Sequence, residues 1–180
     1  INKIDAEKLE PLNIEFKLHK VLDDVVESLQ QNAHEKKTEL ILDYDPTIPK
    51  KLMGDPIKLS QIFMNLVGNA LKFTKNGRVE VIAKMLKKEE DQVKIYFEVR
   101  DNGIGISEDQ QKNIFESFEQ GSIQINREYG GTGLGLTIVK SLLGLFGSTI
   151  HLESELDHGS SFYFEMDLDY ESKEGDEIAF

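Results

Sequence analysis

The stretch that decides the fold is QIFMNLVGNALKFT, residues 61–74, and a helix start precedes it at Asp55-Pro56. Aspartate is a favoured helix N-cap, and proline suits the first helical position because the N–H that it lacks would have no partner there. Apolar side chains then recur at helical spacing and form one stripe, at positions 59, 62, 63, 66, 67, 70 and 71. We therefore predict an amphipathic helix from residue 55 to about residue 74, with this stripe in the core.

Three polar residues border that stripe: Asn65, Asn69 and Lys72. At 100° per residue they fall within roughly 60° of one another around the helix. For any one of them, a solvated helix flank is the better interpretation. Asparagine is a poor helix former, however, so two of them one turn apart need a reason. Amide oxygens can ligate Mg²⁺ and an ammonium offsets phosphate charge, so the trio suits a magnesium-bound polyphosphate.

A second candidate site follows the predicted strand 93–101, which runs into DNGIG, residues 101–105. Every second residue from Val93 to Val99 is apolar, so Asp101 continues the side that faces the core. Taken alone, such an aspartate is more often one that caps a turn. The functional interpretation is an acceptor for a ligand amine, such as the exocyclic amine of adenine. Gly103 and Gly105 would let the backbone approach a flat ring closely.

A third candidate is GGTGLG, residues 130–135, at the start of a predicted helix 133–146 that Gly147 ends. The free N–H groups and the dipole at a helix start attract anions. A flexible hinge is the plain alternative, but glycines destabilise a helix start and therefore need a reason. The stretch has neither the Gly-Lys-Ser/Thr ending of a P-loop nor the preceding strand of a dinucleotide fingerprint.

The rest of the chain predicts mixed secondary structure. One helical face spans residues 18–33, and a further helix starts with Ser107 as its cap and ends near Phe118. Strands are predicted at residues 12–18, 40–42, 79–86, 93–101, 150–153 and 161–168. Because strands and helices do not alternate strictly, we expect an α/β sandwich in which one mixed sheet is covered by helices. A polar loop is predicted at residues 119–129.

Composition narrows the class of function. The chain has 180 residues, enough for one domain, and a formal net charge of −12. Nucleic acid is disfavoured as a partner, since a phosphate backbone needs clustered lysine and arginine. The absence of cysteine excludes thiolate metal sites and thiol nucleophiles, and the four histidines lack metal-ligand spacing. No apolar run reaches the about 18 residues of a membrane span.

In combination and in this order, the motifs resemble those of sensor histidine kinases over residues 12–168. Residues 61–74 resemble the N box of that family, and DNGIGI, residues 101–106, its first glycine box. FESF (115–118) is similar to the F box, YGGTGLGL (129–136) to the second glycine box, and GSSF (159–162) to the last one. The resemblance implies the Bergerat-type ATP-binding fold shared with gyrase, MutL and related chaperones. That fold is a two-layer sandwich, with a mixed sheet of about five strands covered on one face by about three helices.

Carried over by position, the resemblance implies a site for ATP and Mg²⁺. Asn69 would ligate magnesium, Asn65 would lie beside the metal or phosphate, and Lys72 would contact phosphate. Asp101 would accept from the adenine amine, and Ser161 would support the adenine end through a water. Residues 119–129 would form the ATP lid, where Arg127 is a candidate phosphate contact and joins Asn65 and Lys72 as a catalytic residue. The other implied nucleotide contacts are Gly103, Gly105, Ile106, Phe118, Gly131, Thr132, Gly133, Leu134, Gly135 and Leu136.

The implied reaction is transfer of the γ-phosphoryl of MgATP to a histidine on another domain. The chain contains no phosphoacceptor motif of the His-Glu-Leu-Arg-Thr-Pro kind and begins with Ile1, so we expect it to be part of a longer protein. Residues 1–11 look like the end of a dimerisation and phosphoacceptor hairpin, residues 12–169 like the catalytic domain, and residues 170–180 like an acidic linker or tail. We expect partnership with that hairpin and with a response regulator receiver domain. We also expect a homodimeric full-length protein, a monomeric isolated segment and a cytoplasmic location for this domain.

Three alternatives remain open. An ATP-hydrolysing switch of the gyrase or MutL kind has the same fold, but those proteins place a glutamate where this chain has Asn65. An amide cannot take a proton from water, so this position favours a kinase. A serine kinase acting on an anti-sigma partner is disfavoured by the F box and the apparent hairpin remnant. A non-catalytic module would bind ATP without transferring phosphate.

Overall fold

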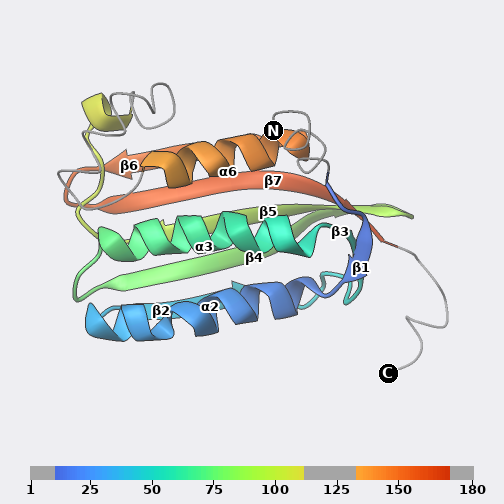
Figure 1. Ribbon diagram of the computed structural model, residues 1–180, viewed down its shortest axis with the longest axis horizontal. Coiled ribbons are helices and arrows are strands. Elements are labelled where there is room, and N and C mark those ends of the chain that lie inside the picture. Colours follow the sequence, from blue (N-terminus) through green and yellow to red (C-terminus); the bar gives the residue numbers. More distant parts are fainter. Residues whose placement is uncertain (1–10, 112–132, 171–180) are drawn as a thin grey trace, which may run out of the picture.

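The computed structural model describes residues 11–111 and 133–170, with backbone alone at 133–135, and shows one sheet covered on one face by helices (Figure 1). The covering helices are α2 (Leu18–Glu35), α3 (Pro56–Lys72) and α6 (Gly133–Leu145). Helix α3 lies between the other two and packs against both. This arrangement confirms the predicted two-layer sandwich with about three helices on one face.

The sheet is mixed, and its strands run in the order β1-β3-β7-β5-β4-β2, with β6 paired to β7. Strands β2 and β4 are parallel, and the other pairs are antiparallel. The strands are β1 (Ile14–Phe16), β2 (Glu39–Tyr44), β3 (Leu52–Gly54), β4 (Arg78–Lys88), β5 (Gln92–Asp101), β6 (His151–Glu155) and β7 (Gly159–Asp169).

The described residues thus form seven strands, more than the about five that were expected. The unpredicted strand is β3, whose three residues are too few to show an alternating pattern. The strand expected at residues 12–18 covers only Ile14–Phe16, because Leu18 already opens α2. The remaining predicted strands and helices within the described residues are present.

The core lies between the helices and the sheet. All seven apolar positions of the predicted α3 stripe are buried. Phe63 of α3 meets Phe97 of β5 and Phe164 of β7, with ring centroids 5.3 and 5.8 Å away. Large aromatic side chains contribute strongly to core stability, so this contact fixes α3 over the two central strands.

Helix α3 begins as predicted, with Asp55 as N-cap and Pro56 at the first position. The Asp55 carboxylate is fully buried, and it accepts hydrogen bonds from Lys58 N (3.0 Å), Lys58 Nζ (3.0 Å) and Leu12 N (2.8 Å). Burial alone would raise the pKa of Asp55, but these hydrogen bonds and the Lys58 charge lower it below its usual value. The incoming chain at Leu12 is therefore joined directly to the start of α3.

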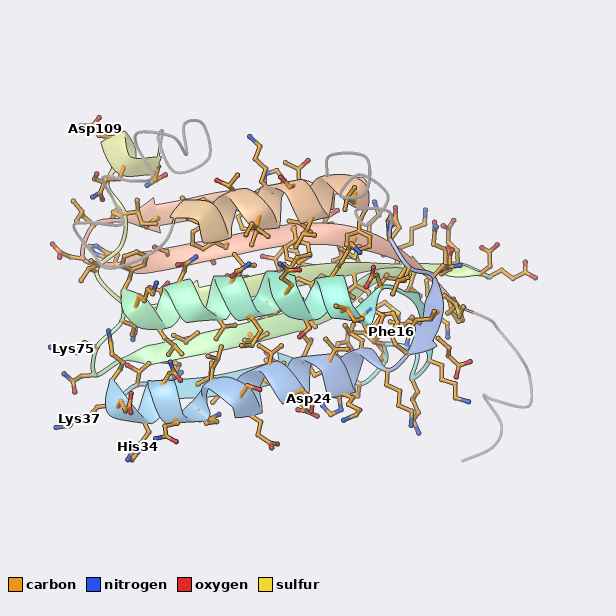
Figure 2. All side chains as sticks on the ribbon, viewed as in Figure 1. Phe16, Asp24, His34, Lys37, Lys75 and Asp109 are labelled. Atoms are coloured by element: carbon orange, nitrogen blue, oxygen red, sulfur yellow. The ribbon has the colours of Figure 1, made fainter. Side chains whose placement is uncertain are left out.

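Several elements meet at the opposite end of α3. Ile104 N donates to Phe73 O (3.0 Å), which connects the segment after β5 to the end of α3. Helix α6 begins at this same end of the molecule (Figure 1). Lys75 and Asp109 also lie there, whereas Phe16 of β1 lies at the opposite end (Figure 2). The fold thus gathers the end of α3, the end of β5 and the start of α6.

Within the described residues, none of the helices combines the length and the apolar character needed to cross a membrane.

Candidate functional site

The three polar residues Asn65, Asn69 and Lys72 form the polar flank of α3, and they differ in exposure. The Asn69 residue is only 6% exposed, Asn65 is half-buried, and Lys72 is exposed. No protein partner accepts or donates to either side-chain amide within the described residues, and Lys72 Nζ forms no ion pair there. Asn69 therefore presents a side-chain amide at the border of the core, where a ligand could pair with it.

Asp101 ends β5 on the helix-covered side of the sheet and is 5% exposed, as its parity with Val99 predicted. Its Oδ1 accepts from Gly103 N at 2.9 Å, and the nearby Ser160 N–H and Thr74 hydroxyl also favour its ionised form. Burial raises the pKa of Asp101 to about 6, and these hydrogen bonds only partly oppose that rise. The Asp101 carboxylate is thus oriented by the backbone and receives few hydrogen bonds.

Gly103 and Gly105 are needed for packing of the chain against itself. A Cβ on Gly103 would lie 2.1 Å from Phe73 O, and one on Gly105 would lie 2.1 Å from Glu155 O. Gly105 also has a φ of +76°, which side chains other than glycine rarely adopt. The two glycines therefore hold the segment after Asp101 between the end of α3 and the turn that follows β6.

The Ser154 hydroxyl helps to connect the same segment to the β6–β7 hairpin, and Asp157 N also donates to Ile104 O at 2.7 Å. Ser154 Oγ accepts from Ile106 N at 2.7 Å, donates to Gly159 O at 2.9 Å and lies 2.8 Å from Ser160 Oγ. The side chain of Ile106 is buried in the core. Sequence reasoning missed Ser154, because nothing in its local sequence marks a serine whose hydroxyl connects two loops.

The Ser161 side chain points to the opposite face of the sheet from the Asp101 side chain. Ser161 pairs with Arg100 in the sheet, and its hydroxyl donates to Glu98 on the face that no helix covers. Ser160 is the residue paired with Asp101, and it is 6% exposed. Because neighbouring strand residues point to opposite faces, a shift of one position changes the side of the sheet. Ser160 is therefore the serine directly opposite Asp101 in the sheet, and the proposed role of Ser161 at the adenine end stays a prediction.

Sequence reasoning also missed Thr74, the residue after α3 and Phe73. It is 1% exposed, and its Oγ1 has no hydrogen-bond partner among the residues that the structure describes. The hydroxyl nevertheless lies close enough to Asp101 to lower the pKa of that carboxyl. An unpaired hydroxyl beside a buried acid cannot be found from sequence, because it depends on two chain segments meeting.

The second glycine-rich stretch is described in part. Gly133, Leu134 and Gly135 form the first turn of α6, as predicted, and Leu136 is buried at 6% exposure. The first N–H groups of a helix have no partner inside it, so this turn offers donors at the end where β5 terminates. Four predicted site residues lie outside the described residues: Phe118, Arg127, Gly131 and Thr132.

A cavity of about 810 Å³ lies at this end of the sheet, but it takes no lining residue from α3 or α6. Its two arginines already have acidic partners, Arg78 with Glu39 and Arg100 with Glu98. These pairs leave little positive charge for a phosphate. The unpaired amides, ammonium and helix start beside α3 are better suited to a polyphosphate than this cavity is.

The polar groups on α3, Asn65, Asn69 and Lys72, carry no negative charge. A bound Mg²⁺ would therefore need the phosphates of the nucleotide to supply it. The described residues contain no cluster of three or more His, Cys, Asp or Glu that could hold a metal. Mg²⁺ commonly takes one or two protein ligands and completes its shell with waters and phosphates. An amide oxygen at Asn69 is compatible with that pattern.

Comparison with known proteins agrees with this geometry. Residues 54–170 match the family model described as histidine kinase-, DNA gyrase B-, and HSP90-like ATPase. The chain is 40% identical over 168 residues to the signal transduction histidine-protein kinase BarA of Escherichia coli (strain K12), covering 93% of this chain and 18% of that protein. It is also 40% identical to the sensor histidine kinase AruS of Pseudomonas aeruginosa, covering 92% of this chain and 16% of AruS.

Solved structures show the same relationship. The crystal structure of full-length ShkA in complex with AMPPNP is 32% identical, with a TM-score of 0.71, over 86% of this chain and 30% of ShkA. The chain spans less than one fifth of the length of the curated relatives above. The matched part includes the helix with Asn65 and Asn69, the loop after Asp101 and the final strand. The chain therefore belongs to the histidine kinase-, DNA gyrase B- and HSP90-like ATPase family, as an ATP-binding catalytic domain of the histidine kinase type.

Proposed function

We propose that this chain transfers the γ-phosphoryl group of MgATP to a histidine on a helical hairpin of the same protein. The observation that carries the proposal is the buried Asp101 carboxylate at the same end of the fold as the polar flank of α3. Phosphoryl transfer needs mainly positioning and charge stabilisation, which such an arrangement can provide without a protein nucleophile. The acceptor then comes from outside the described residues.

Each group would have a separate task in this reaction. Asp101 accepts a hydrogen bond from the exocyclic amine of adenine and fixes the base. Asn69 holds Mg²⁺, which neutralises phosphate charge when it is bound, and Asn65 lies one turn away on the same flank. Lys72 and the first N–H groups of α6 contact phosphate oxygens. We assign the lid to residues 119–129, with Arg127 as a further phosphate contact.

The partners follow from the same proposal. Residues 1–11 would be the end of a dimerisation and phosphoacceptor hairpin, and residues 170–180 a linker. The histidine of that hairpin would pass its phosphoryl group to a receiver domain of a response regulator. Support comes from the relatives named above, which are signal transduction and sensor histidine kinases.

The proposal is tested by mixing this chain with a separately produced acceptor hairpin from the parent protein and γ-labelled MgATP. We expect acid-labile, base-stable label on the hairpin, as for phosphohistidine. Asn69→Ala should abolish the transfer. Asn32→Ala, an exposed asparagine on α2, is the matched control and should transfer normally. Tight ATP binding without labelled hairpin would contradict kinase activity and favour a nucleotide-binding module.

An ATP-hydrolysing switch is the second candidate, and Asn65 argues against it. An amide cannot accept the proton of an attacking water, so little phosphate should be released without the hairpin. A substantial hairpin-independent release of phosphate that Asn65→Ala removes would overturn the choice of kinase.

A further inference from the structure

The Thr74 hydroxyl is a polar atom in a place where polar atoms are usually paired. The residue is 1% exposed, and Oγ1 has no hydrogen-bond partner in the part of the chain that the structure describes. Leaving a buried hydroxyl unpaired is unfavourable, while a side chain of the same shape without the hydroxyl avoids the loss. Packing alone therefore does not explain a threonine here, because valine would fill the same space.

The surroundings of Thr74 fix the direction of its hydroxyl. A Cβ placed on Gly77 would lie 2.8 Å from the Thr74 methyl carbon, and one on Gly103 would lie 2.7 Å from Oγ1. The methyl group is thus turned toward Gly77 and the hydroxyl toward Gly103. The Gly103 N–H donates to Asp101 Oδ1, so the hydroxyl and the carboxylate share one small region.

Asp101 needs donors if it is to accept an amine. A buried carboxylate must remain ionised and correctly oriented, and both conditions depend on the hydrogen bonds that it receives. The backbone N–H of Gly103 already donates to it, and the Ser160 N–H lies near enough to lower its pKa. The Thr74 hydroxyl is a third donor at hand, and in the free protein it does not yet meet hydrogen-bond geometry.

We propose that Thr74 is a positioning residue for Asp101, and that its hydroxyl donates to this carboxylate when an exocyclic purine amine binds there. The inference rests on the nucleotide-binding function proposed above. An amine that draws the carboxylate into place lets the hydroxyl complete its donor set. The unfavourable burial of the hydroxyl in the free protein is then recovered only in the complex, so Thr74 increases affinity for a purine that carries the amine.

Two variants separate this role from packing. Thr74→Val keeps the shape and removes the hydroxyl, and Thr74→Ser keeps the hydroxyl. We expect the melting temperature of Thr74→Val without nucleotide to equal or exceed that of the unsubstituted chain. Its affinity for MgATP in calorimetry should fall by about five- to tenfold, the range for one lost hydrogen bond, and Thr74→Ser should restore most of it.

A second nucleotide gives the decisive comparison. Purine riboside triphosphate lacks the 6-amino group, so it should bind the unsubstituted chain and Thr74→Val with equal affinity. An equal loss for both nucleotides, a lowered melting temperature of Thr74→Val, or unchanged ATP affinity would overturn the role of Thr74. If the unsubstituted chain does not bind ATP, the proposed function fails as well, and the two failures are therefore distinguishable.

Discussion

Asp101 is a buried carboxylate, so the stability of the fold should depend on pH. Burial raises its pKa from 3.8 to about 6 in the folded chain, so the folded state binds the proton more tightly than the unfolded state does. Protonation of Asp101 therefore stabilises the folded state. This contribution to the free energy of unfolding is complete below pH 3.8 and is lost as the pH rises through about 6.

Nucleotide binding should show the opposite dependence on pH. An amine needs the ionised carboxylate as acceptor, so we expect the affinity for ATP to fall as the pH drops from 7 through 6. Calorimetric titrations at several values between pH 5 and 8 would measure this decline. Asp101→Asn serves as the control, because it cannot titrate and should lack this component. An equal decline in that variant would assign the effect to another group.

The same substitution tests the adenine contact at constant pH. Asp101→Asn should weaken ATP binding at neutral pH by about 1–3 kcal/mol, because the amide is a poorer acceptor and presents N–H groups to the ligand amine. Asp109→Asn changes an exposed carboxylate at the same end of the molecule and should have no effect. Equal affinities of Asp101→Asn and the unsubstituted chain would remove Asp101 from the site.

The contact between α3 and the loop after β5 depends on the absence of a side chain at Gly103. Gly103→Ala would place a Cβ 2.1 Å from Phe73 O, so either α3 or the loop must move. We expect a loss of about 2 kcal/mol or more in the free energy of unfolding, measured by denaturant titration, together with weaker ATP binding. Gly144→Ala in α6 meets nothing within 4 Å and should instead stabilise the helix by up to about 1 kcal/mol.

At the other end of α3, the prediction concerns its N-cap. Asp55→Ala removes the cap and the acceptor for Leu12 N, and it breaks the ion pair with the largely buried Lys58 ammonium. We expect a loss of about 3 kcal/mol in the free energy of unfolding. Asp24→Ala breaks an exposed pair with Lys20 and should change stability by less than about 1 kcal/mol. Similar small losses for both would mean that the buried pair adds no more than a surface pair.

The elements that sequence predicted well are those with long regular patterns. Helix α3 and strand β5 each carry an unbroken periodicity, and from it both the buried faces and the orientation of Asp101 followed. Strand β3 is too short for periodicity, and the choice between Ser160 and Ser161 depends on the register of β7 against β5. Thr74 could not be identified because its role depends on Gly103, almost thirty positions away, rather than on its neighbours. Contacts of that kind are set by tertiary structure.

For the molecule as a whole, ligand binding should appear as added stability. At a MgATP concentration 100 times the dissociation constant, binding contributes about 2.7 kcal/mol, which raises the melting temperature of a domain of this size by about 5–10 °C. Chelation of magnesium with EDTA should reduce the rise in differential scanning fluorimetry. In Asn69→Ala, the rise in melting temperature on addition of ATP should be the same with and without magnesium. A rise in that variant that still needs magnesium would place the metal elsewhere.

The joint between Leu12 and Asp55 has a mechanical consequence. Helix α3 has 17 residues and is therefore about 25 Å long, and its two ends touch different segments of the chain. Because the helix buries apolar side chains along its length, we expect it to move as one rigid unit. We therefore expect a displacement of the backbone at Leu12 to shift Lys72 through the whole helix, without local unfolding between the two points.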